Sequence, residues 1–184
     1  MNTITFDFRD GNGPVPAHQH ANGGGWVADT ASVADAVFVG PDAMVYGNAM
    51  VSGYAVLSGY TRLSGTVAVS GRAEVSGKAR LFGNAVVSEH AKVSENACVY
   101  GYSEISGRAE VSGNSKLSGN AVVSEHAKVS ENAWAYGHAE ISGYAWTYGC
   151  AEISGHVKVS GDAKVFGYAK LSGHAKISGE AEVS

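Results

Sequence analysis

Residues 73–78 read Ala73-Glu74-Val75-Ser76-Gly77-Lys78, and residues 79–84 repeat the pattern as Ala79-Arg80-Leu81-Phe82-Gly83-Asn84. Each unit has a small residue and, two positions later, an aliphatic one. That spacing puts both side chains on one face of a β-strand. The glycine supplies the positive φ that a tight turn needs. A period of six drifts around the 3.6-residue turn of a helix, so the stretch predicts a four-residue strand and a two-residue turn.

The repeat fills most of the chain, which makes it the first feature to interpret. Its aliphatic column keeps one phase from residue 27 to the end and has two exceptions, Ala135 and Thr147. The column comprises Val27, Val33, Val39, Val45, Val51, Leu57, Leu63, Val69, Val75, Leu81, Val87, Val93, Val99, Ile105, Val111, Leu117, Val123, Val129, Ala135, Ile141, Thr147, Ile153, Val159, Val165, Leu171, Ile177 and Val183. The regular spacing predicts an all-β solenoid without helices.

Unusual residues recur at multiples of 18, which indicates three units in each coil. The block 83–97 reappears unchanged at 119–133, a shift of 36. Aromatic residues replace serine at one corner, at Tyr46, Phe82, Tyr100 and Tyr136, and at another, at Tyr148 and Phe166. We therefore expect triangular 18-residue coils, with about eight to nine of them between positions 27 and 184.

The composition excludes several other classes of protein. Hydrophobic residues make up 45% of the 184 residues and the net charge is −4, which argues against both disorder and nucleic-acid binding. The sequence has no apolar run long enough for a membrane span, and its first residues do not resemble a signal peptide. We therefore expect a cytoplasmic protein or a component of a phage particle.

The units resemble the transferase hexapeptide-repeat family, in which an aliphatic residue is followed by a small or acidic one. The stretches 27–31, 33–37 and 39–43 match that pattern strictly, as in Val27-Ala28-Asp29-Thr30-Ala31. Later units move the glycine one place on. The resemblance implies a left-handed parallel β-helix. The segment Gly23-Gly24-Gly25-Trp26-Val27 also looks like uncharacterised bacterial and phage hexapeptide-repeat proteins.

The two ends of the repeat differ in sequence. We interpret residues 1–26 as an N-terminal cap and residues 27–184 as the β-helix. Ile4, Phe6 and Phe8 alternate with polar residues as in a half-buried strand, and we expect Trp26 to cover the first layer. The last unit has no such cap, and an open parallel edge favours pairing. We therefore expect self-association, as a trimer or another homo-oligomer, or end to end through the C-terminal coil.

One outward column supports stacking in parallel. At 18-residue spacing it reads Glu74, Lys92, Glu110, Lys128, Trp146, Lys164 and Glu182. Charges of opposite sign thus alternate between neighbouring coils, as cross-strand pairing favours.

The histidines are candidate site residues, although we favour the interpretation that they are solvent-facing residues of the turns. His138, His156 and His174 are 18 apart and predict a ladder. Two neighbours of such a ladder suit a zinc or nickel ion, but three in a straight column do not converge on one tetrahedral centre. His18 and His20 form a second group in a turn-rich loop. We expect no cofactor and no metal.

A contact surface is a further candidate, because exposed aromatic residues in a patch often mark one. Five of them gather within about one coil: Trp134, Tyr136, Tyr144, Trp146 and Tyr148. The two cysteines, Cys98 and Cys150, lie nearly three coils apart, too far for an intramolecular disulfide.

The uninterrupted repeat favours a non-catalytic, rigid structural or interaction module, and the resemblance to phage hexapeptide-repeat proteins implies an association with phage or prophage. Two alternatives stay open. The resemblance implies an acyltransferase with a histidine in a trimer groove, for which His90, His126 and His138 are the candidates. The tryptophans suggest a glycan-binding surface.

Overall fold

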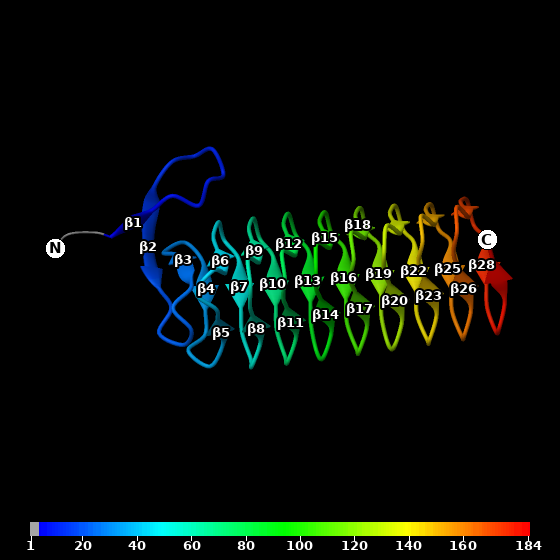
Figure 1. Cartoon of the computed structure of the whole chain (residues 1–184), viewed down its shortest axis with the longest axis horizontal. Helices are drawn as coiled ribbons and strands as arrows, with labels where there is room; N and C mark the ends of the chain where they lie inside the picture. Colours follow the sequence, from blue (N-terminus) through cyan, green and yellow to red (C-terminus); the bar gives the residue numbers. More distant parts are fainter. Residues whose placement is uncertain (1–3) are drawn as a thin grey trace.

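Regular stacking of short strands organises the computed structural model, which describes residues 4–184 (Figure 1). The strands form three parallel walls around a central core, and each wall gains one strand per coil. Partners in a wall come from successive coils, as in the pairing of Glu74 with Lys92. The expected all-β solenoid of triangular 18-residue coils is confirmed, with nine repeat strands in each wall.

Wall 1 is an 11-stranded sheet. Its strands are β1 (Thr5–Phe6), β2 (Val15–Gln19), β3 (Trp26–Ala28), β6 (Met44–Val45), β9 (Arg62–Leu63), β12 (Arg80–Leu81), β15 (Cys98–Val99), β18 (Lys116–Leu117), β21 (Trp134–Ala135), β24 (Glu152–Ile153) and β27 (Lys170–Leu171).

Wall 2 is a nine-stranded sheet. Its strands are β4 (Ser32–Val33), β7 (Met50–Val51), β10 (Ala68–Val69), β13 (Val86–Val87), β16 (Glu104–Ile105), β19 (Val122–Val123), β22 (Glu140–Ile141), β25 (Lys158–Val159) and β28 (Lys176–Ile177).

Wall 3 is also nine-stranded. Its strands are β5 (Phe38–Val39), β8 (Val56–Leu57), β11 (Glu74–Val75), β14 (Lys92–Val93), β17 (Glu110–Val111), β20 (Lys128–Val129), β23 (Trp146–Thr147), β26 (Lys164–Val165) and β29 (Glu182–Val183).

The repeat strands are mostly two residues long rather than the expected four, because the chain bends at three corners in every coil. Hydrogen bonds nevertheless continue around the corners. The backbone N–H of Glu74 donates to the carbonyl of Ala91 at 2.9 Å, and that of Tyr60, in a turn, donates to Gly77 at 2.7 Å. Coils therefore hold one another through turns as well as strands.

The core runs along the whole solenoid and consists of the aliphatic and small columns. The inward residues of the middle coils are completely buried, for example Val75 and Ala79. The two exceptions to the aliphatic column, Ala135 and Thr147, also face inward and are buried. The hydroxyl of Thr147 is one of three buried side-chain oxygens without a hydrogen-bond partner among the described residues, with those of Thr61 and Ser115.

The N-terminal segment extends wall 1 instead of lying flat over the first coil. Strand β1 pairs antiparallel with β2, and β2 pairs antiparallel with β3. The expectation for Trp26 is wrong: it lies on the outside of β3 and stacks on Phe6, with 4.2 Å between ring centroids. The side chain that packs against the first coil is His20, whose Nε2 is 3.0 Å from the Val37 carbonyl oxygen.

Four corner positions carry glutamate where the other coils have glycine: Glu89, Glu95, Glu125 and Glu131 all have positive φ. The glycine one coil earlier is essential to each. A Cβ added to Gly113 would stand 2.5 Å from the backbone nitrogen of Glu131. The coil that carries the glutamate lies close to the coil before it, because Asn114 N is only 2.6 Å from Glu131 O. It lies farther from the coil after it, where Asn132 N is 2.8 Å from Gly149 O. A glutamate turn therefore requires a glycine turn before it.

Removal of single coils tests this rule. Deleting residues 84–101 leaves glycine turns in contact, whereas deleting 102–119 stacks Glu89 and Glu95 directly on Glu125 and Glu131. Both deletions keep the phase of the repeat, and each brings like charges together in the outward column. We expect the second to be less stable by about 2 kcal/mol or more, the cost of overpacking at two corners. Denaturant unfolding of the two proteins would measure it, and equal stabilities would contradict the rule.

A second test concerns the unpaired hydroxyl of Thr147. Valine has nearly the same shape and removes the buried polar group, so Thr147→Val should stabilise the fold by about 1–2 kcal/mol. The control Thr147→Ser keeps the hydroxyl and loses the methyl group, and it should lower the melting temperature. A Thr147→Val protein that melts at or below the wild type would show that the hydroxyl has a partner in solution.

Candidate functional site

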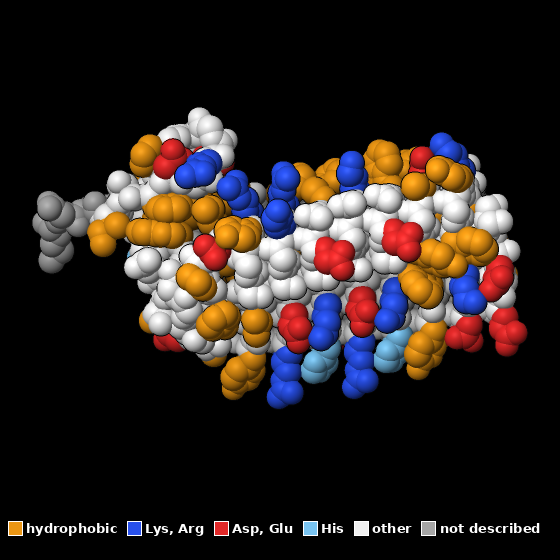
Figure 2. Space-filling view, viewed as in Figure 1, with side chains coloured by type: hydrophobic (Ala, Val, Ile, Leu, Met, Phe, Trp, Pro, Cys, Tyr) orange, Lys and Arg blue, Asp and Glu red, His pale blue; other side chains and the backbone are white. Residues whose placement is uncertain are grey.

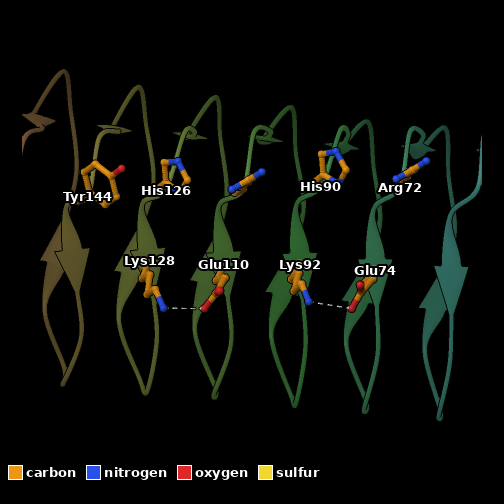
Figure 3. Close-up of a pocket in the computed structure, with 9 residues that line it drawn as sticks. Arg72, Glu74, His90, Lys92, Glu110, His126, Lys128 and Tyr144 are labelled. Carbon is orange, nitrogen blue, oxygen red and sulfur yellow. Dashed lines mark ion pairs between the residues drawn. The ribbon is translucent and has the colours of Figure 1, made fainter.

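A shallow groove runs along wall 3. Its volume is about 510 Å³. Two columns of side chains line it (Figure 3), and each contributes one side chain per coil. The turn column comprises Arg72, His90, Arg108, His126 and Tyr144, and the strand column comprises Glu74, Lys92, Glu110 and Lys128.

Within the strand column, each lysine pairs with the glutamate of the preceding coil, so the charges of the column cancel. Lys92 lies 3.2 Å from Glu74, and Lys128 lies 3.0 Å from Glu110. The alternation expected from the sequence is therefore confirmed, and the same column ends with Lys164 2.8 Å from Glu182. These side chains are about half exposed, so each pair contributes about 0–1 kcal/mol and mainly fixes the register.

Among the described residues, the arginines of the turn column form no ion pair. Arg72 and Arg108 lie two coils apart, and histidines stand in the coils between and after them (Figure 3). At the C-terminal end of the groove, the ring of His126 stacks on Tyr144 with centroids 4.7 Å apart. The groove therefore has a cationic rim that ends in an aromatic platform.

Apolar side chains bracket this charged stretch of wall 3. On the N-terminal side, Phe38 pairs with Val56, and both remain partly exposed beside Tyr54. On the C-terminal side, Trp146 follows Lys128 in the strand column and is 41% exposed. Figure 2 shows this sequence along its lower edge: apolar, then alternating acidic and basic, then apolar. Wall 3 thus offers a long mixed surface.

The five aromatic residues expected to form one contact surface lie on two different walls. Trp146 and Tyr148 pack together on wall 3, with ring centroids 4.6 Å apart, and Tyr144 lies in the turn before them. Trp134 and Tyr136 pack together on wall 1, 4.7 Å apart. The indole of Trp146 donates to Ser130 Oγ at 3.0 Å, which turns it toward a corner. The structure brings three of the five together and separates the other two.

The histidine ladder is present as a stack at a corner outside the groove. The centroids of His138 and His156 are 4.7 Å apart, and those of His156 and His174 are 4.9 Å apart. Within residues 4–184, no group of three or more His, Cys, Asp or Glu side chains has an arrangement that would hold a metal ion. Of the three candidate catalytic histidines, His90 and His126 share the groove, and His138 lies apart in the stack.

The two histidines near the N-terminus do not converge on a common point. His18 Nδ1 lies 2.8 Å from Asp29 Oδ1 on the surface, whereas His20 is buried against the first coil. Asp29 is 11 residues from His18, so the sequence alone does not mark it as a partner.

The cysteines are both free, as expected. Cys98 lies on wall 1 between Arg80 and Lys116. Burial raises the pKa of the Cys98 thiol, and the charges of Arg80 and Lys116 oppose that rise. The thiol therefore carries less thiolate at neutral pH than an unperturbed cysteine.

Comparison with known families agrees with the geometry over a short segment. A model of the YdcK beta-solenoid repeat matches residues 43–59. The protein is a β-solenoid repeat protein. No match was found among curated proteins. Among the described residues, no helix has the length and apolar character needed to cross a membrane.

The environment of Cys98 gives a measurable pH dependence. In a Cys150→Ser background, alkylation should be slow at pH 7.5 and should rise at higher pH than for an unperturbed thiol, because its raised pKa leaves less thiolate. Arg80→Gln removes one opposing charge, so its rate profile should move to still higher pH. A wild-type profile at lower pH than that of an unperturbed thiol would show that burial is not the dominant influence. An Arg80→Gln profile that moves to lower pH would show that Arg80 does not oppose the rise.

Proposed function

We propose that the protein is a non-catalytic, rigid interaction module that works through wall 3. The observation that carries the proposal is the construction of the groove: five consecutive coils each contribute one turn side chain to it, in unbroken register. Such a surface recognises an extended partner along the axis of the solenoid. Small-molecule sites, in contrast, are usually concave and enclose most of the ligand.

The state of the charged groups supports binding rather than chemistry. The carboxylates of Glu74 and Glu110 are engaged by lysines, and the ring of His126 is stacked on Tyr144. A general base needs a free nitrogen or oxygen within hydrogen-bond reach of the reacting proton, usually with a second group that orients it. The groove offers charge and stacking surface in alternation instead.

The partner that we propose is a second copy of the chain, in a homo-oligomer. The apolar side chains at both ends of the charged stretch, Phe38 and Val56 on one side and Trp146 on the other, would be covered in such a contact. Alternating charges between them would fix the register of the two surfaces and discriminate against slipped arrangements. A component of a phage or prophage particle would use such a module as a rigid building part.

A glycan-binding surface is the second candidate, favoured by the position of Tyr144 and Trp146. Both are exposed at the end of the groove, and their rings offer flat faces to the carbon side of a sugar. A linear oligosaccharide lying in the groove would end on this platform. The acyltransferase alternative depends on the family resemblance and on the shared groove of His90 and His126, and it requires a trimer that binds an acyl donor.

Paired variants on the two walls separate these candidates. Light scattering should show a homo-oligomer for the wild type. A Val56→Lys/Trp146→Lys variant should be monomeric, because it places cations in the apolar ends of wall 3. Trp134→Lys, the matched control on wall 1, should keep the wild-type size. A monomeric wild type at high concentration, or dissociation of the control, would contradict an oligomer built through wall 3.

The same proteins test the alternatives. Glycan binding would show as calorimetric binding of chitohexaose that Trp146→Lys abolishes and Trp134→Lys preserves. The acyltransferase would show as a trimer whose melting temperature rises with acetyl-coenzyme A, and the rise would be lost in His126→Ala. For the interaction module we expect neither effect.

A further inference from the structure

The alternation of charge breaks at one place on wall 1. Elsewhere five Lys–Glu pairs join neighbouring coils, with N–O distances of 2.6 to 3.2 Å. On wall 1, Arg62 of β9 lies in direct register with Arg80 of β12. Their outer neighbours in the column are Met44 and Cys98, so no carboxylate precedes or follows them. Like charges directly opposite each other destabilise a sheet. Lys158 and Lys176 form another such pair on wall 2, but Glu140 lies 2.6 Å from Lys158 and relieves it, whereas the two arginines have no carboxylate partner among the described residues.

A third cation adds to the cluster. Lys78 and Tyr60, from the turns before β12 and β9, line one hollow with Arg62 and Arg80, with a volume of about 320 Å³. In Figure 2, basic side chains gather beside the N-terminal loop at this part of the surface. Three cations thus meet within two coils of a protein whose net charge is −4.

The acidic residues nearest to the cluster do not neutralise it. Asp10, from the N-terminal loop, borders a second hollow beside the two arginines. Its carboxylate accepts hydrogen bonds from the backbone and side-chain nitrogens of Asn12, both at 3.0 Å, and these bonds lower the pKa of Asp10. Glu95 lies at the corner next to Lys78 and is exposed. The ion pairs of the described residues include neither of these acids with Arg62, Lys78 or Arg80.

We propose that Arg62, Lys78, Arg80 and Tyr60 form a binding site for a phosphate monoester. The arginines stand on neighbouring strands, about 4.8 Å apart. Each guanidinium can donate two parallel hydrogen bonds, so the two together can hold different oxygens of one tetrahedral anion. The ammonium of Lys78 and the hydroxyl of Tyr60 reach the remaining oxygens. A dianion removes the repulsion between the arginines, which a planar monoanionic carboxylate does only in part.

The second hollow accommodates the rest of the ligand. Arg62 and Arg80 also border a space of about 320 Å³ whose walls include Tyr46 and Phe82. These rings offer flat apolar surface next to the charged group. The ligand class is therefore a phosphate monoester of a ring-shaped alcohol, such as a sugar phosphate. The site lies on wall 1 and does not depend on the function proposed for wall 3.

Thermal unfolding tests the anion site. At equal ionic strength, replacing chloride by inorganic phosphate should raise the melting temperature of the wild type by several degrees, because the folded state alone binds it. The Arg62→Gln/Arg80→Gln variant should lose that rise. In low-salt chloride it should melt at or above the wild type, because the repulsion is gone. The control Lys158→Gln/Lys176→Gln, a like-charged pair in register on wall 2, should keep the full rise.

Three outcomes would overturn the site. One is a wild-type melting temperature that is the same in both salts. Another is a full rise in the Arg62→Gln/Arg80→Gln variant, because phosphate also stabilises folded proteins by exclusion from their surface. The third is an equal loss of the rise in the wall 2 control, which would indicate general screening of charge.

Calorimetry tests the proposed ester. Glucose 6-phosphate should bind at least tenfold more tightly than inorganic phosphate, and Tyr46→Ala/Phe82→Ala should remove that advantage without changing the affinity for inorganic phosphate. Equal affinities of the wild type for the two ligands would overturn the role of the second hollow. An unchanged advantage in the aromatic variant would do the same.

Discussion

Every coil of this protein depends on the backbone hydrogen bonds that join it to the next. Outward residues donate to a carbonyl of the following coil, in strands and turns alike. Because this register is constant, side chains that are one full coil apart in the sequence come to lie one above another. The inward columns then merge into one continuous buried core, and the outward columns become straight rows of charge, aromatic rings or histidines. A change of one residue in register would turn the aliphatic column outward, so the hydrophobic pattern and the ladder enforce each other.

The fold could be predicted from the sequence because each inference needed only this period. The aliphatic column, the stacked pairs such as Phe82 with Tyr100, and the Lys92–Glu74 pair all follow from counting by 18. The expected aromatic contact surface shows that closeness in the sequence does not place two residues on the same wall. Trp134 and Trp146 are separated by two hexapeptide units, which means two corners and therefore a different wall. Proximity in sequence grouped them, and the geometry of the coil separates them.

Features outside the repeat could not be predicted in this way. Trp26 lies outside the core, and His20 packs against the first coil, because the N-terminal hairpin extends wall 1 at its edge. Nothing periodic specifies that placement. The sequence also does not indicate the groove, although it contains every residue that lines it. Arg72 and His90 occupy turn positions, and only the direction of the turn shows that they share a hollow with Glu74 and Lys92.

The rule that a glutamate corner must follow a glycine corner gives the chain a natural unit of two coils. Its trace is the identity of residues 83–97 with 119–133. Recombination between such identical stretches inserts or removes two coils at once and always restores a permitted neighbour at each corner. The length of the rod can therefore evolve in even steps without any compensating substitution, whereas loss of the single coil between the two glutamate coils would stack one glutamate corner on another. Packing at a corner thus decides which changes in the reach of the molecule can be inherited.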